Sequence, residues 1–175
     1  MSAAAVPRIP ADRASFVERF GAVVEHSPWV AERAFSHGPF ADVVDLHAAF
    51  DAELRAATTD LQLDVLRAHP ELAAERVIPR GELTPESRSE QAGAGLDALA
   101  DERRLALAAQ LAAYRGRFGF PFIACVRDHG SVAALEGLVA ERVGRAPEAE
   151  LATALAEVSS IARHRLVDLV DGSPA

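Results

Sequence analysis

Apolar residues recur every three or four positions along most of this 175-residue chain. That spacing puts the apolar side chains on one face of an α-helix. One such run, Leu107, Leu111, Tyr114 and Phe118, is closed by Gly119. The hydrophobic fraction of 50% owes much to alanine and only 6% of residues are aromatic, which favours close-packed helices over a core built from strands. The pattern predicts an all-α fold, with a single compact domain of about seven to nine helices.

Capping and helix-breaking residues indicate where these helices begin and end. The candidate starts are Ser27-Pro28, Asp60, Thr84-Pro85, Ser131 and Pro147. One helix must stop near His69, because Pro70 disfavours helical geometry in the residue before it. The segment 120–127 contains Pro121 and is too short for a helix, so we expect a loop there.

The chain has the length of one ordinary domain. We expect a single domain over 1–175, with flexible ends at 1–10 and 171–175. No apolar run approaches the roughly 18 residues that a membrane-spanning helix needs. Cys125 is the only cysteine, which excludes an intrachain disulfide and leaves a cytoplasmic protein as the expectation.

Charge and the absence of lysine restrict the function. A net charge of −8 disfavours nucleic acids and anionic membranes as partners, so an anionic ligand must be held by local positive groups. All 18 basic residues are arginine. Without a lysine amine the chain can form no Schiff base, anchor no pyridoxal phosphate and build no Walker A loop.

The histidines do not have metal-ligand spacing, because neither His-x-x-x-His nor Glu-x-x-His occurs. We therefore expect no metal. His164 and Asp168, four residues apart, are interpreted as a surface pair. Cys125 is interpreted as a small buried side chain.

Ser87, Glu90 and Gln91 are spaced so that all three project from one helix face. Two interpretations stay open: a solvated face near a helix start, or part of a binding site. The apolar run from Phe118 to Ile123 also has two possible interpretations. It can be core, or it can form the wall of a dry pocket that offers backbone NH groups to a ligand.

The positions of His69 and Arg165 in their helices restrict the roles that these two side chains can have. At a helix C-terminus His69 is favoured as the imidazolium by the helix dipole, although capping and packing roles are also open. Arg165 has Ile161 four residues before it and Leu169 four after, so it lies on a stripe expected to face inward. Its guanidinium can snorkel, pair with a carboxylate such as Glu90, or bind a substrate anion.

Several motifs together resemble the 2-oxo-4-hydroxy-4-carboxy-5-ureidoimidazoline (OHCU) decarboxylases of urate breakdown. They are Ser27-Pro28-Trp29, His69-Pro70-Glu71-Leu72-Ala73, Ser87-x-x-Glu90-Gln91, Arg117-Phe-Gly-Phe-Pro-Phe-Ile123 and Arg165-Leu166. The resemblance implies a helical enzyme without cofactor, commonly a homodimer, that converts OHCU to (S)-allantoin and carbon dioxide. It also implies association in one pathway with uricase and hydroxyisourate hydrolase.

The same resemblance assigns roles to individual residues. His69, Glu90 and Arg165 fall on the family's catalytic positions, with Arg163 as the competing arginine. The substrate-binding positions correspond to Pro70, Ser87, Gln91, Phe120, Phe122 and Ile123. Two alternatives remain: a decarboxylase of a related ureido or imidazoline acid, and a non-catalytic helical binding protein with the same fold. Which group delivers the final proton is not decided by the sequence.

Overall fold

The computed structural model describes residues 9–71 and 101–172. These residues form eight α-helices and one short 3₁₀ helix, with no strand among them, which confirms the all-α prediction. The helices are α1 (Arg13–Phe20), α2 (Trp29–Ala34), η1 (Phe35–His37), α3 (Val43–Ala56), α4 (Thr59–Ala68), α6 (Asp101–Phe118), α7 (Val126–His129), α8 (Val132–Arg142) and α9 (Pro147–Asp171). The predicted helix start at Thr84-Pro85 and most of the predicted flexible ends lie outside the described residues.

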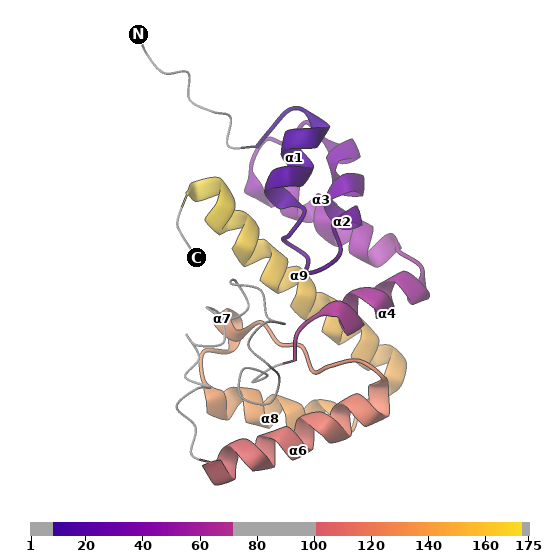
Figure 1. Ribbon diagram of the computed structural model, residues 1–175, viewed down its shortest axis with the longest axis vertical. Coiled ribbons are helices and arrows are strands. Elements are labelled where there is room, and N and C mark those ends of the chain that lie inside the picture. Colours follow the sequence, from indigo (N-terminus) through magenta and orange to yellow (C-terminus); the bar gives the residue numbers. More distant parts are fainter. Residues whose placement is uncertain (1–8, 72–100, 173–175) are drawn as a thin grey trace.

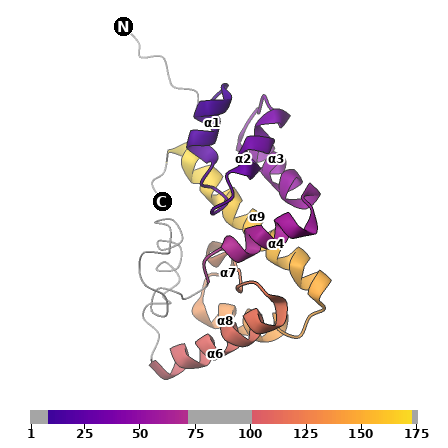
Figure 2. The same ribbon diagram turned by 45° about the vertical axis from the view of Figure 1, so that its right-hand side comes forward.

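The long helix α9 organises the fold (Figure 1). α3 packs along it, α4 crosses it, and α1 and α2 pack with α3 toward its C-terminal half, drawn in yellow (Figures 1 and 2). α6 and α8 lie around its N-terminal half, whereas α7 is ion-paired to Asp168 and His164 in its C-terminal half; α8 contacts both α6 and α7. None of the described helices combines the length and the apolarity needed to span a bilayer.

Two of the predicted helix starts are confirmed in atomic detail. The hydroxyl of Ser131 accepts a hydrogen bond from the backbone N–H of Ala134, which caps α8. Pro147 is the first residue of α9, where its missing N–H leaves no helical hydrogen bond unmade. In both places the residue chemistry is local, so the sequence pattern was sufficient.

Two other predicted caps are wrong by one or two residues. Asp60 lies inside the first turn of α4. The cap is Thr58, whose hydroxyl accepts a hydrogen bond from the backbone N–H of Leu61. Ser27 does not cap α2, which begins at Trp29 after Pro28 and has no side-chain cap. A Thr-Thr-Asp run offers several acceptors, and only the path of the preceding chain selects among them.

The loop predicted at 120–127 is shorter than expected. It ends at Cys125, and Val126–His129 form the one-turn helix α7, closed by Gly130 with φ 73°.

The predicted inward position of Leu169 is also wrong, because 38% of this residue is exposed. Each four-residue step along a helix turns it about 40° past a full circle, so two steps from Ile161 carry Leu169 about 80° off the buried stripe.

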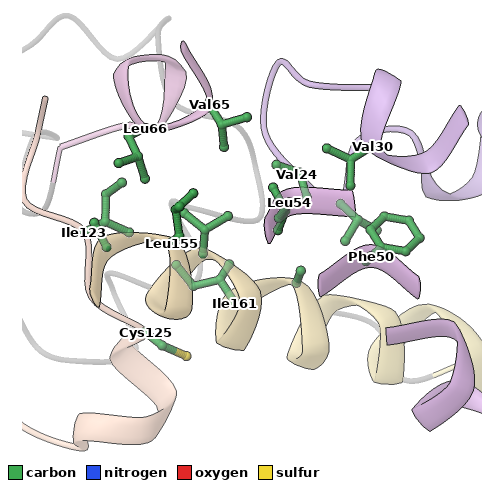
Figure 3. Close-up of a cluster of buried hydrophobic side chains, with 14 of the residues drawn as sticks. Val24, Val30, Phe50, Leu54, Val65, Leu66, Ile123, Cys125, Leu155 and Ile161 are labelled. Carbon is green, nitrogen blue, oxygen red and sulfur yellow. The ribbon is translucent and has the colours of Figure 1, made fainter. Parts of the chain in front are cut away.

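The core is continuous along α9 (Figure 3). Leu66 of α4, Ile123 of the loop before α7 and Leu155 of α9 all belong to it. Phe50 and Leu54 of α3 extend the same cluster toward the α1–α2 region. The end of α4 and the loop 120–125 are therefore anchored through apolar contacts to one helix, which is the helix that carries Arg165.

Candidate active site

His69 is the C-cap of α4, and its backbone N–H donates to the carbonyl of Leu66 over 3.3 Å. Its φ and ψ of −73° and 136° are extended, as the following Pro70 requires. Only 8% of His69 is exposed, whereas Pro70 is half-buried. The end of α4 thus turns the imidazole into the protein and away from water.

Arg165 on α9 is buried, with 5% of the residue exposed. Its Nη1 donates to the backbone carbonyl of Val23 and its Nη2 to the Oε1 of Glu25, each over 3.1 Å. Glu25 is buried as well. Of the roles left open by the sequence, the structure shows pairing with a carboxylate, and this carboxylate comes from the turn between α1 and α2.

The fold of this turn explains why Glu25 faces inward. Val23 and Val24 are buried in the core and fix the turn against α9. His26 adopts a left-handed φ of 52°, and the N–H of Ser27 donates back to the carbonyl of Val24 over 3.1 Å. This reversal directly after Glu25 keeps its carboxylate beside Arg165.

The pKa of His69 is lowered from 6.5 to about 4, mainly because burial penalises the charged ring. The carboxylate of Glu25 opposes this shift, while the charges of Arg165 and His26 add to it. The imidazolium expected from the helix dipole is therefore wrong, since loss of water outweighs the effect of the helix end. At neutral pH His69 is a neutral imidazole, which has one nitrogen able to accept a proton.

The aromatic loop has buried side chains throughout: Phe120, Phe122 and Ile123 are each at most 3% exposed. The ring of Phe122 meets Tyr114 edge to face with centroids 5.1 Å apart. The guanidinium carbon of Arg142 lies over the Phe122 ring, 4.5 Å from its centroid. Burial of these side chains fits both the core and the pocket-wall interpretation, so a contact between this loop and a ligand stays a prediction.

A buried ion pair between Arg142 and Glu150 holds the loop 120–125, and it was not predicted from the sequence. Arg142 donates from Nη1 to the carbonyl of Ile123 and from Nε to Glu150 Oε1, each over 2.8 Å. The hydroxyl of Tyr114 donates to the same carboxylate oxygen. A signal was present, because Glu150 lies four residues before the buried Ala154 on the inward stripe of α9.

The interpretation of His164 and Asp168 as a surface pair is wrong. His164 is half-buried, and its Nε2 lies 2.7 Å from Asp128 Oδ1. Asp168 Oδ2 lies 2.7 Å from Arg127 Nη2. Both residues point to α7, which the sequence had not indicated as a helix, so their partners could not be foreseen.

Cys125 is buried, as expected, but it is not isolated from histidine. Its sulfur and one ligand atom each of Asp128 and His164 lie within 4.8 Å of one another. The guanidinium of Arg163 already contacts both Asp128, at 3.2 Å, and His164, at 3.1 Å. A positive group therefore occupies the approach to this cluster, which we interpret as an ionic contact between α7 and α9.

An open hollow of about 460 Å³ lies between α7 and α9, and its lining includes His129, Glu157 and Ser160. Among the residues that the structure describes, none of those proposed for substrate or catalysis lines it. The hollow therefore does not coincide with the group formed by His69, Arg165 and Glu25.

The structure describes only part of the predicted site. His69 and Arg165 act on each other electrostatically, and the exposed Arg163 is directed to Asp128 instead. Ser87, Glu90 and Gln91 lie outside the described residues. In the group around His69 and Arg165, sequence reasoning missed Glu25, because nothing local connects it to a partner 140 positions away.

These features define an all-α protein with a buried histidine, arginine and glutamate at the junction of α4, α9 and the α1–α2 turn. The family model described as OHCU decarboxylase matches residues 10–167. The chain therefore belongs to the OHCU decarboxylase family.

Individual relatives match nearly the whole chain. An OHCU decarboxylase of Haloferax volcanii is 41% identical over 90% of this chain and 90% of its own length. A human protein named as a putative OHCU decarboxylase is 42% identical over 94% of both chains. A crystal structure of (S)-allantoin synthase superposes with a TM-score of 0.71 at 27% identity, covering 91% of this chain; this chain spans half of the synthase chain.

Proposed function

We propose that this chain is a cofactor-independent carboxy-lyase that decarboxylates OHCU to (S)-allantoin in urate breakdown. The observation that carries the proposal is the buried Arg165 guanidinium, which acts electrostatically on a neutral His69 in a member of this family. A buried cation beside a group able to accept a proton suits an anionic substrate that must lose carbon dioxide and rearrange a proton.

The substrate supplies its own electron sink, in agreement with the absence of lysine. As the bond to the carboxylate breaks and carbon dioxide leaves, its electron pair forms a C=C bond with the neighbouring ring carbon. The ring C=N nitrogen takes up a proton in the same step. The resulting enol loses its hydroxyl proton and gains a proton on carbon, and addition to one face sets the S configuration.

His69 is proposed to contact the hydroxyl and carboxylate region of the substrate. Because its pKa is about 4, the imidazole is neutral at neutral pH and can accept a proton as the enol collapses to the carbonyl. A neutral ring also avoids holding the departing carboxylate by charge, which would stabilise the substrate more than the transition state.

Arg165 is proposed to bind the carbonyl or developing oxyanion, with Glu90 placed near the carboxylate so that their repulsion favours loss of carbon dioxide. Pro70, Ser87, Gln91, Phe120, Phe122 and Ile123 are proposed to line the pocket or orient the ring. The burial of the aromatic loop supports a site wall that excludes water on this side.

The net charge of −8 argues against nucleic acid as the partner, and the buried Arg165 supplies the local positive group that a small anionic molecule needs. We further propose a cytoplasmic homodimer that works in sequence with uricase and hydroxyisourate hydrolase. Analytical ultracentrifugation of the purified chain tests the dimer, and a monomer at micromolar concentration would contradict it.

The activity is tested by generating OHCU freshly from urate with uricase and hydroxyisourate hydrolase and then adding this protein. The expected result is an acceleration of OHCU loss in proportion to the protein added. Heat-denatured protein is the control. Loss of OHCU at the uncatalysed rate would overturn the proposal and favour a non-catalytic binding protein.

Related ureido and imidazoline acids are the second group of substrates to assay. The proposal predicts that OHCU has a higher kcat/KM than any of them, because Arg165 and His69 must meet the carbonyl and hydroxyl of the same ring. A higher kcat/KM for another acid would reassign the substrate while leaving the decarboxylase chemistry in place.

A further inference from the structure

Glu25 lies in the turn between α1 and α2, far in sequence from the residues that the proposed function uses. Its side chain is 1% exposed, and its Oε1 lies 3.1 Å from Nη2 of Arg165, whose side chain is 5% exposed. The same turn provides a second acceptor, the carbonyl of Val23, to Nη1 of Arg165. One turn therefore contacts both terminal nitrogens of one guanidinium.

Two contacts to different nitrogens fix more than the position of a charge. A guanidinium is planar and rigid, so acceptors on Nη1 and Nη2 together determine the orientation of its plane. A single contact would leave the group free to rotate about it. The α1–α2 turn thus holds the plane of the Arg165 guanidinium through both terminal nitrogens, whereas the helix α9 sets where its side chain begins.

The electrostatics of the same group support a link to the site. The Glu25 carboxylate and the Arg165 guanidinium act on His69 in opposite senses, and His26 adds to the effect of Arg165. Burying a carboxylate is costly unless it is paired. Glu25 and Arg165 therefore stabilise each other's charge in the buried site. Both are close enough to His69 to act on its pKa.

We propose that Glu25 is a positioning residue that holds the Arg165 guanidinium in the orientation from which it meets the substrate. The proposal rests on the proposed function, because it assumes that Arg165 binds the reacting molecule. Glu25 does not touch the substrate; it acts through Arg165. A role confined to stability would affect folding without altering the orientation or the kinetics of the folded enzyme.

The variant Glu25→Gln keeps the size of the side chain but replaces the carboxylate by a neutral amide oxygen, which binds a guanidinium too weakly to hold its plane as the carboxylate does. We expect kcat to fall by about 100-fold, the effect of displacing a positioning group by about 1 Å, with a smaller change in KM. Glu25→Asp keeps the charge and withdraws it by one methylene, and we expect it to retain part of the lost kcat. If Glu25→Gln does not fold, Glu25→Asp compared with wild type provides the same kinetic comparison.

A second measurement reports on Arg165 without turnover. In ¹⁵N NMR spectra a guanidinium fixed at both nitrogens gives separate Nη signals, and a rotating one gives averaged signals. The Arg165 signals are assigned from their absence in Arg165→Lys. We expect separate signals in wild type and averaged signals in Glu25→Gln.

The matched control is Glu136→Gln, which removes the carboxylate of an ion pair between α6 and α8 where Arg103 Nη2 lies 2.6 Å from Glu136 Oε2. It should change neither kcat nor the Arg165 signals. Unchanged kcat in Glu25→Gln, or lowered kcat with unaltered Arg165 signals, would overturn the positioning role. Wild-type protein inactive on OHCU would instead overturn the proposed function, and the NMR comparison would still show whether Glu25 holds Arg165.

Discussion

Arg142 donates from Nη1 to the backbone carbonyl of Ile123 over 2.8 Å, so a charged side chain of α8 holds the loop that precedes α7. The same guanidinium pairs with Glu150 at the start of α9, and both side chains are at most 1% exposed. The loop proposed to wall the site is thus attached to two helices through one buried ion pair. Its conformation depends on charges that lie outside the motifs quoted from the sequence.

Removing Arg142 should therefore be strongly destabilising. Arg142→Ala leaves the buried Glu150 with only the more distant Arg145, at 4.0 Å, as a cation, which costs about 3–5 kcal/mol in the free energy of unfolding. Urea denaturation followed by circular dichroism measures this. The control is Arg103→Ala, which breaks the exposed pair with Glu136 and should cost less than about 1 kcal/mol. Equal losses in the two variants would contradict the structural role of the buried pair.

His69 should make stability depend on pH. Its pKa is about 4 when folded and 6.5 when unfolded, so between these values the unfolded chain binds more protons. The contribution of His69 to the free energy of unfolding is complete above pH 6.5. It is lost as the pH falls to about 4, by about 3 kcal/mol in total. We expect the difference in unfolding free energy between wild type and His69→Gln to shrink by that amount over this range. A difference that stays constant with pH would show that His69 is not buried as a neutral ring.

The two titratable groups assigned to catalysis can be tested by truncation. His69→Ala and Glu90→Ala should each abolish turnover of OHCU, because the first removes the proton acceptor and the second the carboxylate near the leaving group. Far-ultraviolet circular dichroism should show the helical content of wild type in both variants. Turnover at the wild-type rate in either one would refute the role given to that residue.

Local chemistry explains which parts of the fold were predictable. Ser131 and Pro147 begin helices through interactions within one turn, and the spacing of apolar residues is enough to locate the helices around them. α7 was missed because one helical turn is too short to show a period. Leu169 was placed wrongly because a stripe of four-residue steps drifts around a helix.

The site shows the same division between local and distant information. The burial of Arg165 followed from its own helix, but the identity of its partner, Glu25, depends on how α1 and α2 fold back onto α9. The charge state of His69 was predicted wrongly because burial is a tertiary property that outweighs the local helix end. Family motifs indicated His69 and Arg165, and they gave no indication of Glu25, Arg142 or Glu150.

Cys125 should be unreactive in the folded protein. Burial, followed by the nearby charge of Asp128, raises the pKa of its thiol to about 12, so very little of the nucleophilic thiolate is present at neutral pH. Mass spectrometry after iodoacetamide treatment should show no labelling of native protein and one label in denaturant. Rapid labelling of the native protein would contradict the burial of this side chain.

The configuration of the product tests the central claim most directly. OHCU decays without an enzyme to racemic allantoin, whereas protonation on one face within a site gives a single enantiomer. Circular dichroism of the allantoin formed from freshly generated OHCU in the presence of this protein should therefore show the signal of the S enantiomer, growing at a rate proportional to protein concentration. A product without optical activity, formed at the uncatalysed rate, would contradict the assignment of this chain as an OHCU decarboxylase.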